Sequence, residues 1–226
     1  MQCRFGSDVG KKFNTDGTVR FWPGNTMVCI LDHHSEVFQR VREVRDALKA
    51  SAIGPFITTL PDESLHMTAI EGVVDGKRDK EHWTSKLPLV APLSEVDDFF
   101  AAEFEKLPPM GKVLMDFDCL RTGGGFNIGL KPHSRDDEER IRTWRKLAAD
   151  AMGLHFPGWE TYVFHIGLAY GITLPDAEGM LVHDTWPERY QKEWHEHPFT
   201  FQVPEPSMTY FDNMFFFSKK RIPRQG

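Results

Sequence analysis

Two short segments decide the fold of this sequence: Leu65-His66-Met67-Thr68-Ala69 and Phe164-His165-Ile166-Gly167-Leu168. Each segment places one histidine inside an apolar run that is typical of a buried strand. Successive side chains of a strand point to opposite faces of its sheet. The pattern therefore predicts that His66 and Thr68 share one strand face, and that His165 and Gly167 share one face of a second strand.

The segments around these two strands follow a similar plan in each half of the chain. In the first half, the patterns predict a strand at 26–31, a helix capped by Ser35, strands at 56–60 and 65–73, and a helix opened by a capping box of Ser94 and Asp97. In the second half, they predict strands at 112–120 and 126–131 around the turn 121–125, a helix between Ser134 and Gly153, and a strand at 161–170. The tail predicts a short helix after Pro187 and strands near 199–203 and 214–217. A plan used twice suggests two lobes related by pseudo-symmetry.

The composition agrees with one globular unit. With 226 residues, of which 40% are hydrophobic and 27% charged, the chain can bury a core, which excludes disordered, collagen-like and coiled-coil classes. Residues 1–25 are expected to be a lead-in, and residues 26–226 a single bilobal domain. The lobes are expected at roughly 26–110 and 111–226, with some strands free to exchange between them.

Charge and cysteine content limit the partners and the location. The formal net charge of −6 repels a long phosphate backbone, so we expect a small nucleotide or an RNA end rather than long nucleic acid. The three cysteines, Cys3, Cys29 and Cys119, are far apart and are expected to be reduced thiols. No signal peptide or membrane span is predicted, so we expect a cytoplasmic monomer that makes no membrane contact.

The two histidine segments resemble a known family. The motifs His66-Met-Thr-Ala69 and His165-Ile-Gly-Leu168 are similar to the paired His-x-(Ser/Thr)-x signature of the two-histidine phosphoesterase superfamily, which includes RNA-end cyclic phosphodiesterases. The phrases around them, and Trp22-Pro-Gly-Asn-Thr26, further resemble a little-characterised bacterial and fungal subgroup. The resemblance extends over roughly residues 20 to 218.

The resemblance implies an α+β fold with two antiparallel sheets, related by a pseudo-two-fold axis around a central cleft, and with helices on the outside. It also implies cleavage of a 2′,3′-cyclic phosphate or a related small nucleotide or RNA-end phosphodiester, without a metal or cofactor. His66 and His165 would be the catalytic pair. Opening such a diester needs one base and one acid, and two imidazoles can hold these opposite protonation states near neutral pH.

The hydroxyl two residues after each histidine would contact the phosphate. Thr68 fits this role, whereas Gly167 departs from the family pattern because it has no side chain. A backbone N–H, a water or another side chain such as Tyr170 would have to replace the donor. Tyr170 has the opposite parity to His165, so it should point toward the helices unless the strand contains a bulge.

Two other functions remain open from the sequence. A non-catalytic nucleotide or RNA-end binding module would explain Gly167. A metal-dependent hydrolase would have to use His183, His195 and His197, although no third ligand lies at a diagnostic spacing. Three further groups are interpreted as surface or core residues, with a position in the cleft as the alternative. They are the glycine turn 123–125, the cations Arg121 and Lys131, and the aromatic tail with Tyr210, Phe211 and Phe215–Phe217.

Overall fold

The computed structural model describes residues 5–223, and within them nine strands form one strongly curled antiparallel sheet. The strands are β1 (Gly24–Ile30), β2 (Ile57–Thr59), β3 (His66–Val74), β4 (Leu114–Thr122), β5 (Gly125–Pro132), β6 (His165–Gly171), β7 (Thr200–Gln202), β8 (Ser207–Asn213) and β9 (Phe216–Ser218). Their order is β7-β4-β5-β6-β3-β1-β8-β9. The short strand β2 pairs with the same edge of β6 as β3 does.

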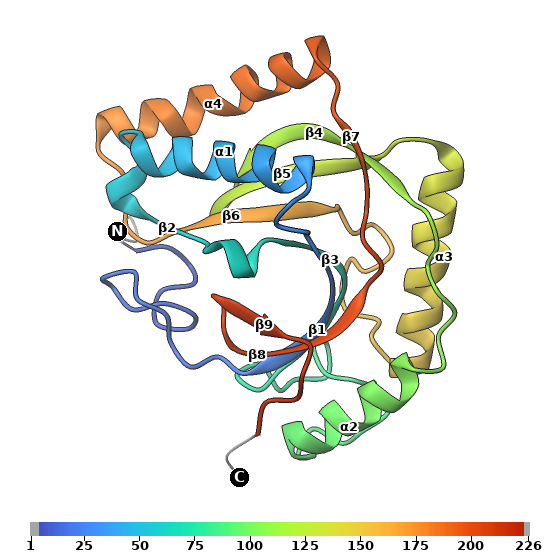
Figure 1. Ribbon diagram of the computed structural model, residues 1–226. Coiled ribbons are helices and arrows are strands. Elements are labelled where there is room, and N and C mark those ends of the chain that lie inside the picture. Colours follow the sequence, from blue (N-terminus) through green and yellow to red (C-terminus); the bar gives the residue numbers. More distant parts are fainter. Residues whose placement is uncertain (1–4, 224–226) are drawn as a thin grey trace.

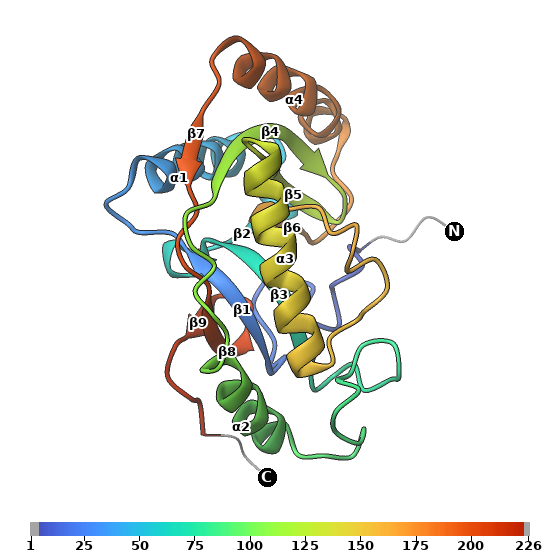
Figure 2. The ribbon, with the colours of Figure 1, turned by 90° about the vertical axis from the view of Figure 1, so that its right-hand side faces the viewer.

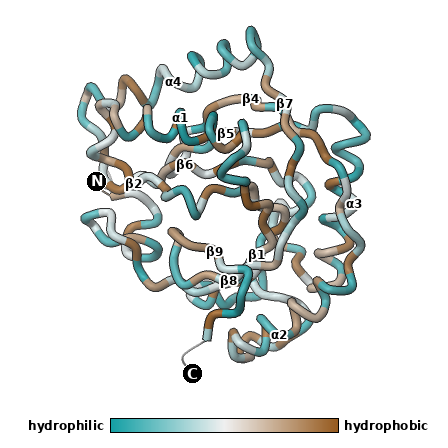
Figure 3. Tube along the Cα trace, viewed as in Figure 1, coloured by the Kyte–Doolittle hydropathy of each residue, from teal (hydrophilic) through white to brown (hydrophobic). Residues whose placement is uncertain are grey.

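The helices lie outside the curl of the sheet (Figures 1 and 2). They are α1 (Glu36–Ala50), α2 (Leu93–Phe104), α3 (Arg135–Met152) and α4 (Ala177–Glu196). Two short 3₁₀ turns, η1 (Gly54–Phe56) and η2 (Asp62–Ser64), flank β2. The hydropathy of the chain follows this arrangement, because hydrophobic residues concentrate on the strands and hydrophilic residues on the outer faces of the helices (Figure 3).

The predicted α+β class with outer helices is confirmed, but the two separate sheets are not. The structure has one continuous sheet, whose halves β7-β4-β5-β6 and β3-β1-β8-β9 meet through the single pair Met67↔Ile166. Each of these residues directly follows a motif histidine. Continuing the antiparallel register by one residue brings Thr68 beside His165. The narrow join between the halves therefore lies at the two histidine motifs.

Helix caps agree with the sequence at three positions and disagree at one. Ser35 and Ser134 accept hydrogen bonds from the first turns of α1 and α3, and Gly153 ends α3 with a left-handed φ of 69°. The capping box at Ser94 is wrong, because α2 begins at Leu93 after Pro92. Asp97 is buried instead and accepts a 2.8 Å hydrogen bond from the Asn25 side chain on β1.

Two elements of the C-terminal part differ from their predictions. The short helix expected after Pro187 is the 20-residue helix α4, which begins at the N-cap Asp176 and contains Pro187. β8 has no counterpart in the sequence prediction, although it pairs with five successive residues of β1. Strand β8 begins after Pro206 and joins the sheet as a long-range partner, which local periodicity does not reveal.

The N-terminal segment 5–23 packs against the sheet. Phe13 is fully buried, and backbone hydrogen bonds join Gly6 to Ile172 and Trp22 to Asp212. Cys29 is buried and Cys119 half-buried, both as free thiols, whereas Cys3 lies outside the described residues. None of the helices within residues 5–223 combines the length and the hydrophobicity needed to cross a bilayer.

Candidate active site

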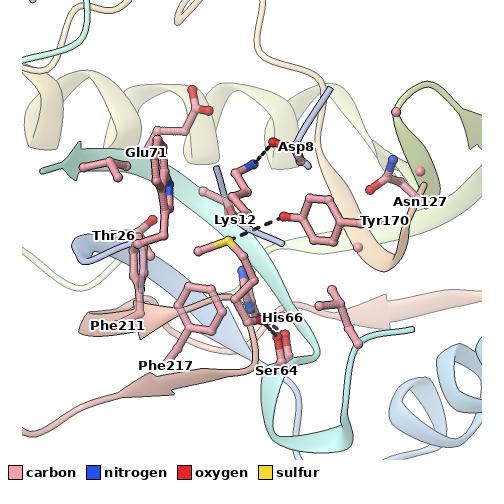
Figure 4. A pocket seen from close by; sticks show the side chains of 18 of the residues that line it. Asp8, Lys12, Thr26, Ser64, His66, Glu71, Asn127, Tyr170, Phe211 and Phe217 are labelled. Atoms are coloured by element: carbon pink, nitrogen blue, oxygen red, sulfur yellow. Dashed lines mark hydrogen bonds and ion pairs between the residues drawn. The ribbon is translucent and has the colours of Figure 1, made fainter. Parts of the chain in front are cut away.

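Both motif histidines line one cavity of about 400 Å³ inside the curl of the sheet, and Figure 4 shows His66 among the lining side chains. Thr68, Gly167 and Tyr170 line the same cavity, so the structure brings together all five residues that the sequence selected. The alternation of β3 is as predicted, since Met67 between the two polar residues is fully buried on the other face. A cavity of this size matches the range of small-molecule sites.

The two imidazoles are held in the same way. Nδ1 of His66 lies 2.8 Å from the carbonyl oxygen of Ser64, and Nδ1 of His165 lies 3.0 Å from the carbonyl oxygen of Val163. Each carbonyl belongs to the residue two positions before its histidine. Because a carbonyl only accepts, each Nδ1 carries the hydrogen, and in the neutral ring Nε2 is left as the basic nitrogen.

A β-bulge on β6 explains why Tyr170 reaches the cavity. Phe126 of β5 pairs with Ala169, but the next residue, Asn127, pairs with Gly167, so Leu168 is an extra residue in β6. The extra residue reverses the alternation of side chains. Tyr170 therefore points into the cavity and not toward the helices, as expected for a strand that contains a bulge.

Strand β3 has a bulge at the equivalent place. Met27 of β1 pairs with Ile70 and Val28 with Thr68, so Ala69 is extra. Beyond it, Glu71 lines the cavity. The two bulges follow the motif histidines by the same three residues, and they make Glu71 the counterpart of Tyr170.

The pKa of His66 is strongly perturbed. Burial lowers it from the ordinary 6.5 to about 4, and the positive charge of His165 adds to the decrease, whereas the hydrogen bond to the Ser64 carbonyl opposes it. The ring also contacts Phe217 edge-on, with 4.4 Å between the ring centroids. His66 is therefore neutral at pH 7.

The N-terminal segment contributes an ion pair to the cavity lining. The Lys12 ammonium is 3.0 Å from Asp8 and 5.0 Å from the centre of the Tyr170 ring. Burial alone would lower the pKa of Lys12, but the charges of Tyr170 and Asp8 outweigh it and raise this pKa. The Tyr170 hydroxyl in turn donates to the sulfur of Met214 over 3.6 Å.

A buried guanidinium supports the Thr68 strand from behind. Arg145 of α3 is 2% exposed and donates hydrogen bonds to the carbonyls of Ala69, the bulge residue, and Trp159. Its guanidinium lies 4.3 Å from the centre of the Tyr162 ring. Burial raises the pKa of Tyr162, while a hydrogen bond with Thr68 acts in the opposite direction. Arg145 thus holds both the bulge and the aromatic neighbour of Thr68.

Other residues that the sequence singled out lie elsewhere or at the edge. Tyr210 is 3% exposed and does not line the cavity, whereas its neighbour Phe211 and Phe217 do. Gly123 and Gly124 form the β4–β5 hairpin turn, as expected, Gly125 begins β5, and all three glycines border the cavity. Arg121 and Lys131 are absent from the lining, and each lies within 4.0 Å of Asp118.

The histidines of the metal hypothesis lie on and just after α4, outside the cavity lining. Within residues 5–223, no group of three or more His, Cys, Asp or Glu side chains is arranged to hold a metal ion. The geometry therefore gives the metal-dependent alternative no site in the described part of the chain.

Several lining residues escaped the sequence reasoning. Lys12 and Asp8 belong to a segment interpreted only as a lead-in, and nothing in their local pattern reveals that it folds back over the sheet. Asn127 could have been predicted from the alternation of its strand, because it is the polar residue between the apolar Phe126 and Ile128. Glu71 follows the first motif but becomes a cavity residue only through the bulge.

Comparisons with known proteins point to a family. A family model described as "2H-phosphodiest: Domain of unknown function (DUF1868)" matches residues 12–123, a stretch that contains the first histidine motif. No curated protein matches the chain. A solved structure from Agrobacterium tumefaciens, the conserved protein of unknown function ATU0111, has 25% sequence identity and a TM-score of 0.82, and the match covers 93% of this chain and 89% of that one.

Two further solved structures are more distant. TT0787 of Thermus thermophilus has 13% identity and a TM-score of 0.47 over 82% of this chain and 87% of that chain. Escherichia coli LigT, solved in complex with ATP, has 11% identity and a TM-score of 0.43 over 84% of this chain and 87% of that chain. The family model over residues 12–123, together with the two histidine motifs of the chain, supports the two-histidine phosphoesterase superfamily.

Proposed function

We propose that this chain is a metal-independent phosphodiesterase that hydrolyses a 2′,3′-cyclic phosphate, or a related small nucleotide or RNA-end phosphodiester. Membership of the superfamily supports a phosphodiesterase-type function at the level of the family. One observation carries the finer proposal: two imidazoles share a cavity, and each is anchored through Nδ1 so that Nε2 remains for the substrate.

The environments of the two histidines suggest their roles. His66 is neutral at pH 7 because burial lowers its pKa to about 4, so we assign it as the base that accepts a proton from the attacking water. The acid that protonates the departing ribose oxygen is then His165. Thr68 lies on the His66 face of β3 and would donate to a non-bridging phosphate oxygen.

The size of the cavity favours a small ligand. Its volume of about 400 Å³ accommodates a nucleotide but not a long strand, and Lys12 and Lys77 line it beside the acidic Asp8 and Glu71, so a phosphate would contact the two ammonium groups locally. Aromatic side chains, among them Phe211 and Phe217, offer apolar surface to the rest of the ligand. A monomer without a cofactor would suffice for this chemistry.

Turnover of the four 2′,3′-cyclic nucleoside monophosphates tests the proposal. His66→Ala and His165→Ala are each expected to lower kcat about 10²–10⁴-fold, because each removes one acid–base group. His34→Ala is a matched control, since His34 is exposed outside the cavity and should keep wild-type activity. Activity should be unchanged by a chelator. Wild-type turnover that both histidine variants retain would contradict the assignment.

The absence of a hydroxyl at Gly167 favours a second candidate, a binding module that keeps the cavity without turnover. In that case the wild-type protein would bind the same cyclic nucleotides, as measured by calorimetry, without hydrolysing any of them. His66→Ala would then change affinity alone. The two functions are therefore separated by measuring binding and turnover on the same four ligands.

A further inference from the structure

The second half of the cavity has no side chain at the position that Thr68 fills in the first half. Gly167 follows His165 as Thr68 follows His66, and it lines the cavity. A Cβ atom added at Gly167 would lie 3.2 Å from Cδ1 of Leu60 and 3.7 Å from Oδ1 of Asn127. The side chain of Asn127 therefore already lies beside the place that a hydroxyl would occupy.

The sheet register puts Asn127 there. Asn127 of β5 pairs with Gly167 of β6, and side chains of directly paired residues point to the same face. Without the bulge, the register that pairs Phe126 with Ala169 would pair Asn127 with Leu168, which is buried on the opposite face. The bulge that turns Tyr170 into the cavity thus also brings Asn127 into it, as Figure 4 shows for both side chains.

The Asn127 carboxamide is available to a ligand. Within residues 5–223, its side chain makes no hydrogen bond of ordinary geometry, although it is half-buried. A carboxamide offers two N–H donors on Nδ2, and a half-turn of the amide group exchanges Nδ2 with Oδ1. No hydrogen bond within residues 5–223 fixes the amide in one orientation, so Nδ2 can face a phosphate oxygen beside Gly167.

A cation lies on the same sheet face. Arg121 of β4 is the register partner of Asn127 on the side away from Gly167, and a Cβ added at Gly129 would be 3.1 Å from its guanidinium carbon. Gly129 is in turn the partner of His165. The Arg121 guanidinium therefore lies over a strand position without a side chain, between its own strand and His165. The guanidinium does not line the cavity and lies 3.9 Å from Asp118, so it makes no direct contact with a ligand there.

We infer that Asn127 contacts the phosphate as the hydrogen-bond donor of the second half, in place of the hydroxyl that Gly167 lacks. The inference rests on the proposed phosphodiesterase function. It assigns one donor to each half: the Thr68 hydroxyl beside His66, and the Asn127 amide beside His165. The donor from the second half thus comes from the neighbouring strand β5 rather than from the motif strand itself.

The test combines removal with rescue. Asn127→Ala is expected to lower kcat for a 2′,3′-cyclic nucleotide on the order of 10²-fold, the usual cost of losing one preorganised donor. Asn127→Asp keeps the shape but only accepts hydrogen bonds at pH 7, so it should lose at least as much. Adding Gly167→Ser to Asn127→Ala should restore kcat about tenfold or more, with Leu60→Ala included to relieve the 3.2 Å contact. The control is Thr122→Ala, a β4 substitution outside the cavity lining.

Each outcome decides the inference. Wild-type kcat in Asn127→Ala would overturn it, whatever Asn127→Asp shows. A melting curve of each variant separates a loss of kcat from unfolding. If the wild type hydrolyses no cyclic phosphate, the proposed function fails separately, and the inference is then read from titration of inorganic phosphate by ³¹P NMR. A tenfold weaker affinity in Asn127→Ala would support the phosphate contact, and an unchanged affinity would overturn it.

Discussion

His66 should make the stability of the protein unusually sensitive to acid. Its pKa is about 4 in the folded state and 6.5 in the unfolded chain, so between these values the unfolded chain binds a proton that the folded state does not. Stability is therefore lost as pH falls from 6.5 toward 4. Integrated from pH 7 to pH 4.5, this single group costs the folded state about 2 kcal/mol.

Replacing His66 by Gln removes this pH-dependent contribution to the free energy of unfolding. Urea unfolding of the wild type and of His66→Gln at pH 7 and at pH 4.5 gives four free energies of unfolding, whose double difference cancels all other titrating groups. We expect that difference to be about 2 kcal/mol in favour of the variant at the lower pH. His34→Gln, an exposed histidine, should give none. A double difference below about 0.5 kcal/mol would show that His66 titrates ordinarily, and its assignment as the neutral base would lose its basis.

Two further predictions concern the scaffold of the site, both measured by urea unfolding. Gly72→Ala should destabilise the fold by about 1–3 kcal/mol, because its Cβ would lie 2.3 Å from the backbone oxygen of Asn25, whereas Gly123→Ala meets nothing within 4 Å and should be near neutral. Equal stabilities would refute the crowding at Gly72. Arg145→Met should cost about 1–3 kcal/mol because the buried carbonyl of Ala69 loses its donor, and wild-type stability in this variant would mean that the bulge needs no such support.

The motif strands were predictable from the sequence because their information is local. Alternation alone placed His66 and Thr68 on one face, and the capping pattern at Ser134 placed the start of α3. The same reasoning failed at Ser94, where a serine in the first turn of α2 looked like a cap. Pro92 ends the preceding loop one residue before the helix, and Asp97 is used by Asn25 on a distant strand.

What could not be predicted depends on pairing between distant segments. The bulges at Ala69 and Leu168 are defined by the partner strands, so no window of β3 or β6 alone reveals them. Strand β8 and the N-terminal segment with Lys12 likewise reach the site through contacts far along the chain. The cavity residues missed in the sequence are those whose direction is set by such register changes or long-range contacts.

The two halves of the site differ chemically on a similar backbone. Both motif strands bulge three residues after the histidine, and both histidines donate through Nδ1 to the carbonyl two residues earlier. The residue beyond each bulge then differs: Glu71 in one half and Tyr170, close to Lys12, in the other. Acid–base catalysis needs two imidazoles in opposite protonation states, and different surroundings decide which of the two holds the proton. In the proposed phosphodiesterase, the differences between the halves, including the empty position at Gly167, would set which histidine is the acid and which the base.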